Sequence, residues 1–168
     1  MLALADVQRL FAFHHWATDR AFDALSVVTA EQLDRAWGGS FGTGRALLQH
    51  VVGVEQLWCE RWNGRSPREI PDFAGTGTGR DFGARWEQIK SNQRRVIDTL
   101  TEERLAAPLA YVNLKGIAWT YPMHEIMQHC VNHGTYHRGQ ITHLLRDLGI
   151  PAPQTDWLVF IDQETKSN

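Results

Sequence analysis

The stretch that decides the fold is residues 122–149, PMHEIMQHCVNHGTYHRGQITHLLRDLG, which contains five of the chain's eight histidines. Pro122 suits a first helical turn, where an N–H has no intrahelical partner, and Gly149 followed by Ile150 and Pro151 marks an end. Apolar or histidine side chains recur between them every three or four residues, at Met123, Ile126, Cys130, His133, His137, Ile141, Leu144 and Leu148. This spacing predicts one long amphipathic helix whose buried face carries two histidines.

His133 and His137 are four residues apart, so a helix places their Cβ atoms about 5–6 Å apart on one face. Two such imidazoles can bind one cation, although histidines on a buried face are also common as hydrogen-bonded structural residues. His129 has the same spacing to His133. Cys130 shares the face, either as a soft ligand or as a small buried side chain. A third ligand from another element is needed to decide.

Gly134 and Gly139 lie beside these histidines. Each glycine inside a helix costs about 1 kcal/mol relative to alanine. We therefore expect that backbone or ligand approaches the helix closely at both positions.

The composition bounds the class of protein. The chain has 168 residues, of which 43% are hydrophobic, and a net charge of −2. A chain of this length buries about 70% of its unfolded surface, enough for a core without covalent cross-links, so we expect one domain over residues 1–168. The balanced charge lacks the basic surface of a DNA- or RNA-binding protein, and we expect no nucleic-acid partner.

The sequence also indicates the cellular compartment. Cys59 and Cys130 are too few for a disulfide framework. Asp6, Gln8 and Arg9 interrupt the first apolar run, unlike in a signal peptide, and no run reaches the roughly 18 apolar residues of a membrane span. We expect a cytoplasmic protein without a membrane partner.

The N-terminal region predicts a helix over residues 5–25 that Asp6 could cap. We expect His14 on its buried face, in a packing or supporting role, and His15 on the surface, since the two point about 100° apart. A capping box at Thr29–Gln32 predicts a short helix before a glycine-rich turn.

A second long helix is predicted over residues 43–62, with a stripe at Leu47, His50, Val51, Val54, Leu57, Trp58 and Arg61. His50 is the third-ligand candidate, because metal sites in helix bundles take side chains from facing helices. Glu55 and Glu60 are expected in solvent, with a role for Glu55 in supporting a ligand as the alternative.

Residues 63–80 are rich in glycine and proline and predict a long crossover connection. A third helix is predicted from an Asp81 cap to Leu100, with Lys90 and several arginines (Arg85, Arg94 and Arg95) outward. Residues 108–121 predict a short β-hairpin, and the apolar segment 156–160 is expected to pack back on the bundle.

These features together resemble the DinB/YfiT-like family of metal-binding four-helix-bundle proteins. The resemblance is carried by the tryptophan-containing first helix, LLQHVVGVE around His50, HCVNHGTYHRGQI in the last long helix and the closing LGIPAPQTDW. It implies an all-α, four-helix bundle of up-down-down-up order, a metal triad of His50, His133 and His137, and a homodimer. Characterised relatives include thiol-dependent S-transferases and a thiol-dependent isomerase.

Three neutral imidazoles favour a divalent transition metal, Zn or Ni first, with Fe, Mn or Cu as further candidates, and leave positions for water or substrate. We expect a metal-dependent transferase that activates a small thiol or water, with a metal-dependent hydrolase or a non-catalytic stress-response protein as alternatives. Gly134 stands where an HExxH protease needs glutamate, which argues against that class. No catalytic role is assigned to Tyr136, Arg138 or Gln140, although Arg138 could hold a carboxylate and Tyr136 could donate a proton.

Overall fold

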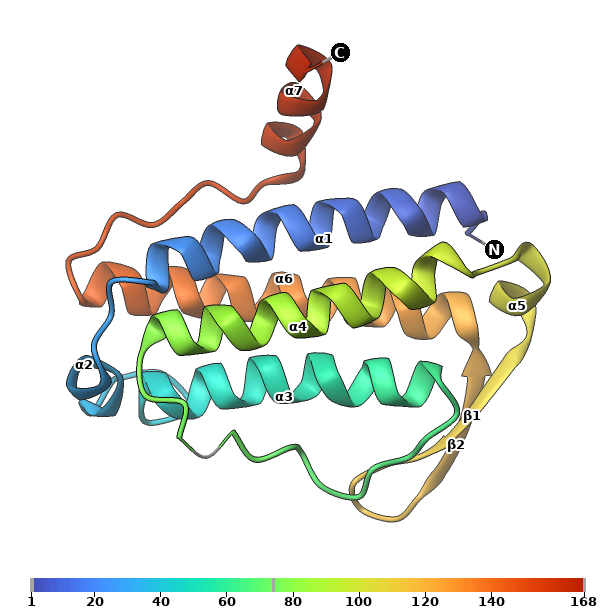
Figure 1. Cartoon of the computed structure of the whole chain (residues 1–168), viewed down its shortest axis with the longest axis horizontal. Coiled ribbons are helices and arrows are strands. Elements are labelled where there is room, and N and C mark those ends of the chain that lie inside the picture. The colour runs from blue at the N-terminus through green and yellow to red at the C-terminus, as the bar shows by residue number, and fades with distance from the viewer. Residues whose placement is uncertain (1, 74, 168) are drawn as a thin grey trace.

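The computed structural model describes residues 2–73 and 75–167. Four long helices lie side by side: α1 (Leu4–Leu25), α3 (Gly44–Trp62), α4 (Gly79–Asp98) and α6 (Met123–Asp147). In Figure 1, α1 and α6 run in one direction and α3 and α4 in the other, and the connection between α3 and α4 runs back along the bundle. The predicted four-helix bundle, its up-down-down-up order and its long crossover are confirmed.

Short elements close the two ends of the bundle. Helix α2 (Ala30–Asp34) lies at one end, and α5 (Glu102–Ala106) lies at the other, beside the hairpin of β1 (Pro108–Val112) and β2 (Ala118–Pro122). The strands pair antiparallel, with Leu109 opposite Tyr121 and Tyr111 opposite Trp119. This confirms the predicted hairpin, which leads directly into α6.

Threonine side chains begin four of the helices. The hydroxyls of Thr29, Thr43, Thr78 and Thr101 each accept a hydrogen bond from the backbone N–H three residues later. The capping box at Thr29 is therefore confirmed, but the prediction that Asp81 caps α4 is wrong. Asp81 lies in the first turn, and its carboxylate accepts a hydrogen bond from the Thr78 N–H at 2.8 Å. Thr78 is the cap because α4 begins at Gly79, three residues earlier than an Asp81 cap would place its start.

The interior contains two clusters of buried apolar side chains. The cluster near the hairpin includes Phe11, Trp58, Trp62, Leu105 and Met127. The cluster at the opposite end includes Leu25, Leu47, Trp86, Ile141 and Leu144. Full burial of such a side chain contributes about 1.5–3 kcal/mol, so these clusters supply the main stabilisation of the bundle.

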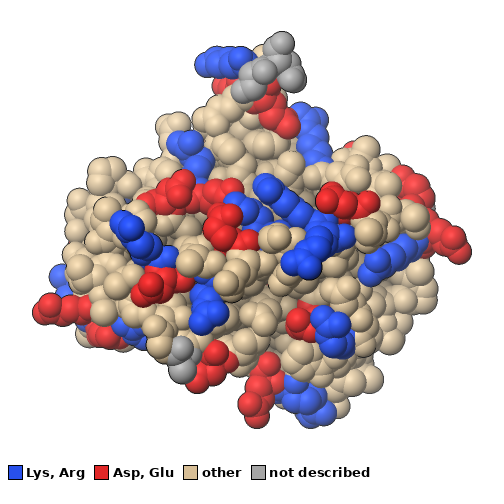
Figure 2. Space-filling model, viewed as in Figure 1, with Lys and Arg blue, Asp and Glu red and all other residues tan. Residues whose placement is uncertain are grey.

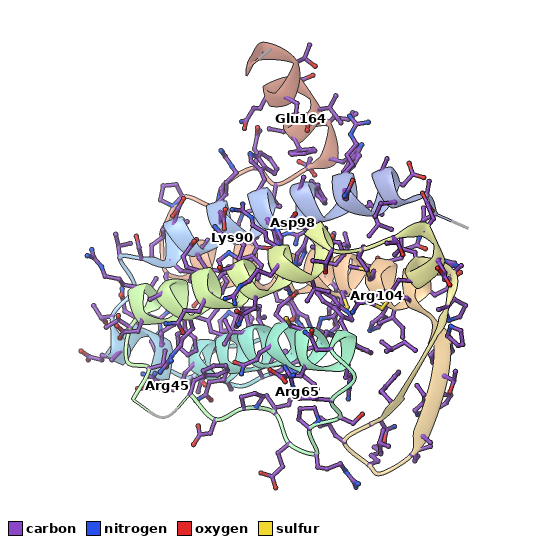
Figure 3. All side chains as sticks on the ribbon, turned by 45° about the vertical axis from the view of Figure 1, so that its right-hand side comes forward. Arg45, Arg65, Lys90, Asp98, Arg104 and Glu164 are labelled. Carbon is purple, nitrogen blue, oxygen red and sulfur yellow. The ribbon has the colours of Figure 1, made fainter. Side chains whose placement is uncertain are left out.

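Lys90 does not point outward as predicted. Only 8% of the residue is exposed, and its ammonium donates hydrogen bonds to Asp19 at 2.8 and 2.9 Å and to Glu87 at 2.6 Å. Asp19 comes from α1, so a partner on another helix draws the lysine inward. Figure 3 shows Lys90 on the side of α4 that faces α1.

The crossover is tied to the bundle through Arg45. Its guanidinium donates hydrogen bonds to the Asp34 carboxylate and to the carbonyl oxygens of Thr76 and Gly77, at 2.6 to 3.0 Å. Figure 3 places Arg45 at the end of the bundle where α3 begins. One side chain therefore connects α2, α3 and the last part of the crossover.

The C-terminal segment is a helix, α7 (Trp157–Ser167), where the sequence indicated only a short apolar segment. It stands off the four long helices in Figure 1. Aromatic rings of α7 pack against α1. The ring centroid of Phe13 lies 4.9 Å from that of Trp157 and 5.7 Å from that of Phe160. The expected packing against the bundle is confirmed.

The surface carries charges of both signs. In the face shown in Figure 2, basic and acidic side chains are interspersed, and neither sign forms a continuous patch. Among the described helices, none is long and apolar enough to cross a membrane.

Two glycines of α4 allow a test of how closely the helices approach. A Cβ at Gly79 would lie 1.9 Å from the Leu25 carbonyl oxygen, whereas a Cβ at Gly83 would meet nothing closer than 3.9 Å. We expect Gly79→Ala to lower the free energy of unfolding by about 1–3 kcal/mol or more through overpacking. Gly83→Ala should raise it by up to about 1 kcal/mol through helix propensity. Urea denaturation of both variants measures the difference, and equal effects would contradict the packing described.

Candidate metal centre

Three histidines from two helices meet at one point. His50 lies in the middle of α3, and His133 and His137 lie one turn apart on α6. The Nε2 atom of His137 is 3.1 Å from that of His50 and 3.0 Å from that of His133. Among the described residues, these three form a group whose ligand atoms all lie within 4.8 Å of one another. The structure therefore brings together the three histidines named from the sequence.

The donor atoms suit a transition metal. Metal–nitrogen bonds of about 2.0–2.1 Å at tetrahedral angles place ligand nitrogens about 3.3 Å apart, close to the separations from His137. Burial, followed by the charge of His137, lowers the pKa of His133 to about 4 and also lowers that of His50. Burial likewise lowers the pKa of His137. At neutral pH all three rings are uncharged, which is the form that binds a cation.

A hydrogen bond orients the buried ligand candidate. The Nδ1 atom of His137 lies 2.6 Å from Gln140 Oε1, and Gln140 Nε2 donates to Ser40 Oγ at 3.2 Å. Because the amide oxygen can only accept, we assign the imidazole proton to Nδ1, which leaves the Nε2 lone pair free. Such outer contacts hold the ring and strengthen it as a ligand. Gln140 therefore supports the His137 ring from the side opposite Nε2.

The whole chain matches a known family. A sequence profile described as the DinB family matches residues 1–167. The chain belongs to the DinB family. The protein DinB of Bacillus subtilis strain 168 is 25% identical over 158 residues, which span 91% of this chain and 92% of that protein.

Two solved structures share the fold of this DinB-family chain. A DinB-like protein of Bacillus cereus ATCC 10987 superposes with a TM-score of 0.70 at 18% identity, over 89% of this chain and 95% of that one. The DinB-like protein YjoA of Bacillus subtilis superposes with a TM-score of 0.64 at 14% identity, over 89% and 97% of the two chains. At these identities the likeness shows the fold alone.

His129, Cys130 and Tyr136 were also candidates from the sequence. They lie near the three histidines of this DinB-family chain but do not belong to the group of converging ligand atoms. His129 is exposed, with its ring centroid 5.4 Å from that of Trp58 and 5.9 Å from that of His133. Cys130 is 1% exposed within the hydrophobic core, and burial raises its thiol pKa well above the usual value. Tyr136 is 66% exposed, and its ring lies 5.1 Å from that of His137. A ligand role for Cys130 therefore has no support in the structure.

A buried polar network lies next to the centre, and sequence reasoning placed two of its members wrongly. His15 and Glu55 were expected at the surface, but they are 4% and 3% exposed. Gln93 on α4 joins them, because its Nε2 donates to Glu55 at 2.7 Å and its Oε1 lies 2.9 Å from His15 Nε2. Glu55 shares the inward face of α3 with Val51 and Trp58, a spacing that could have identified it.

Glu55 carries the negative charge of the network. Burial raises the pKa of its carboxyl, but nearby His14 and the hydrogen bond from Gln93 outweigh burial, so the pKa is lowered overall. His14 Nε2 lies 3.2 Å from Glu55 Oε1. The angles do not meet the requirements of a hydrogen bond, so the contact is electrostatic. The carboxylate charge in turn acts to raise the pKa of His133 and His137, against their burial. An anion near the three histidines favours a cation among them.

Arg138 points into the interior and not toward a substrate. It is 3% exposed, and its guanidinium donates to His14 Nδ1 at 3.1 Å, to Thr18 Oγ1 at 3.2 Å and to Thr135 Oγ1 at 2.7 Å. These contacts use the terminal nitrogens, so the suggestion that Arg138 holds a carboxylate of substrate has no support.

Only one of the two glycines of α6 accommodates a close approach. A Cβ at Gly134 would lie 2.4 Å from His14 Cε1, so the glycine lets the His14 ring reach the helix. Gly139 has nothing within 4 Å of the same position, and the expectation of a close contact there is wrong.

The network predicts a pH dependence of stability. Burial, followed by the charge of His14, lowers the pKa of His15 from 6.5 to about 4. A lowered folded-state pKa means that this stability is complete above pH 6.5 and is lost as pH falls toward 4, because the unfolded chain takes up the proton first. The contribution is about 3 kcal/mol, at 1.36 kcal/mol for each pKa unit.

We expect the His15→Gln variant to lose less stability than the wild type between pH 6.5 and 4. Denaturation curves at several pH values measure this slope. His133 titrates in both proteins, so the comparison isolates His15, and parallel curves would contradict its neutral, buried state.

Proposed function

We propose that this protein is a metal-dependent enzyme that uses His50, His133 and His137 to bind a divalent transition metal, zinc or nickel first. One observation carries the proposal: three uncharged imidazole nitrogens converge where two helices meet. Three protein ligands leave at least one coordination position for water or substrate, as in catalytic zinc sites. Membership of the DinB family supports the same reading.

A bound metal of this type would supply Lewis acidity, which lowers the pKa of a water or thiol ligand and makes it a nucleophile at neutral pH. The leading proposal for the reaction is transfer of a low-molecular-weight thiol to a small electrophile. Metal-dependent hydrolysis, with water as the nucleophile, is the alternative within enzymes.

The chain's own residues have distinct tasks in this proposal. Gln140 keeps the His137 proton on Nδ1 and fixes the direction of the ring. Glu55 supplies negative charge from the interior and stays outside the ligand group. Tyr136 is a largely exposed phenol beside His137, which suits contact with substrate and transfer of a proton.

Removal of a ligand should weaken metal binding. We expect His50→Ala, His133→Ala and His137→Ala each to lower the affinity for zinc or nickel by at least about tenfold, because each removes one of three ligands. Competition with a chromogenic chelator measures the affinity. The protein is purified without a histidine tag or nickel column.

The matched controls are two exposed histidines of the same helix. His129→Ala and His143→Ala should leave metal affinity within about twofold of wild type, because neither belongs to the group of converging nitrogens. Loss of metal in the His129 variant, or retention in the His50 variant, would overturn the assignment of ligands.

The reaction is tested with the metal-loaded protein. We expect glutathione, bacillithiol or mycothiol to be transferred to 1-chloro-2,4-dinitrobenzene faster by wild type than by His137→Ala. Hydrolysis of p-nitrophenyl acetate, measured in parallel, tests the alternative. A metal-loaded protein that is inactive with every thiol would contradict transfer.

A second candidate function, metal binding without turnover, is favoured by one observation. Glu55, the buried carboxylate near the centre, is already engaged by His14 and Gln93, so it is not free to act as a general base. Electron–nuclear double resonance on a cobalt-substituted sample detects water bound to the metal. A site that is saturated with metal but holds no exchangeable water would support this candidate over an enzyme.

A further inference from the structure

A pocket lies where the hairpin meets α3 and α6. It has a volume of about 330 Å³, a size that suits a small ligand, and is lined by Trp58, Tyr111, Tyr121, Glu125, Ile126 and His129. Trp58 and Ile126 are 7% and 3% exposed, so they form an apolar floor. Tyr121, Glu125 and His129 are exposed and form a polar rim. This arrangement suits a molecule whose body is apolar and whose polar group stays at the rim.

The pocket adjoins the candidate metal centre along α6. His129 precedes His133 by one helical turn, and the centroids of their rings are 5.9 Å apart. The His129 ring also lies 5.4 Å from that of Trp58, which belongs to the floor of the pocket. A continuous row of three rings therefore leads from the pocket floor to a proposed metal ligand.

The rings of the pocket are arranged to receive a further ring. Trp58 meets Tyr111 and His129 edge to face, at interplanar angles of 73° and 69° with centroids 5.3 and 5.4 Å apart. Aromatic rings prefer such contacts, which stabilise a pair beyond the burial of apolar surface. A planar aromatic ligand therefore gains more in this pocket than a saturated molecule of similar size.

The charges around the pocket disfavour an ionic ligand. Its six lining residues include one carboxylate, that of Glu125, and no lysine or arginine, so an anion would meet a like charge and no counter-charge. The Arg61 guanidinium lies over the rings of Trp58 and Tyr111, 4.5 and 4.6 Å from their centroids, and its charge acts against a cation on the same rings. Glu125 attracts a cation only weakly, because its side chain is 58% exposed and solvent screens its charge. A neutral ligand avoids both penalties.

We propose that this pocket binds a neutral aromatic molecule of one or two rings that carries a hydroxyl group. The aromatic body packs on the floor, and the hydroxyl stays at the rim, where the Glu125 carboxylate can accept its hydrogen bond. In the proposed enzyme the pocket holds the body of the electrophile beside the metal. That use rests on the proposed function, whereas the ligand class rests on the pocket alone.

The test compares four bicyclic probes: neutral 2-naphthol, anionic 2-naphthoate, cationic 2-naphthylmethylammonium and saturated decahydro-2-naphthol. Affinities are measured at pH 7 by NMR titration of metal-free, full-length protein with isotope-labelled histidines. We expect 2-naphthol to bind at least about tenfold more tightly than either ion, because an apolar floor removes the hydration of a charge. It should bind at least about threefold more tightly than the saturated alcohol, through its ring contacts.

Tyr121 offers a variant that leaves the buried core untouched, because 41% of the residue is exposed. Tyr121→Ala should weaken the binding of 2-naphthol at least about fivefold, since one wall of the pocket is lost. Ile117→Ala is the matched control. Ile117 is an apolar residue of the same hairpin, 50% exposed and outside the pocket lining, so the affinity should stay within about twofold of wild type. Glu125→Gln removes the rim charge and should narrow the difference between 2-naphthol and 2-naphthoate.

The location is read from wild type in the same titration. The imidazole signals of His129 should shift as 2-naphthol is added, while those of His143, which is exposed further along α6, should stay unchanged. Because neither metal nor turnover is involved, loss of this binding leaves the proposed metal chemistry standing, and loss of catalysis leaves the pocket standing. Equal or tighter binding of either ion or of the saturated alcohol, unchanged binding in Tyr121→Ala, or no shift at His129 would each overturn the proposal.

Discussion

The candidate metal centre depends on the close approach of α3 to α6, which brings His50 Nε2 to 3.1 Å from His137 Nε2. The contact joins residues 87 positions apart in the chain. The connection between α3 and α4 is long because these two helices run in the same direction, and α6 runs antiparallel to both. Burial then keeps the three rings uncharged, so the packing that brings the histidines together also prepares them to bind a cation.

The polar residues of the interior occupy a definite level of the bundle. On α3, α4 and α6, the residues Glu55, Gln93 and Arg138 lie between the positions that feed the two apolar clusters. Each is hydrogen-bonded to a side chain of another helix, which is the condition for stable polar groups in a core. The layer orients helices relative to one another and places a negative charge beside the three histidines. Gly134 is part of this arrangement, since its missing side chain admits the His14 ring.

Two buried arginines in one small protein illustrate the difference between a satisfied and an unsatisfied charge. Arg138 is surrounded by acceptors and lies near an anion, so its presence is explained by the fold. The Arg61 guanidinium lies instead against the rings of Trp58 and Tyr111. A charge is costly to bury, and contact with the faces of two aromatic rings offsets part of that cost.

The sequence by itself determined the elements that depend on local chemistry. Periodic apolar residues located the four long helices, a capping box located the start of α2, and the four-residue spacing within α6 paired His133 with His137. His50 could be added because its position on the inward face of a second helix is also a local property. The hairpin before α6 was evident from its turn residues.

Only the tertiary structure decided which polar side chains are buried, because their partners come from other helices. His15 and Glu55 contact Gln93 on α4, and Lys90 contacts Asp19 on α1. Their polar character placed all three outside, although Glu55 is in helical phase with Val51 and Trp58. Thr78, the last residue of the crossover, caps α4. The contacts of Arg61 with Trp58 and Tyr111 could likewise be recognised only in the assembled core, because Tyr111 comes from the hairpin.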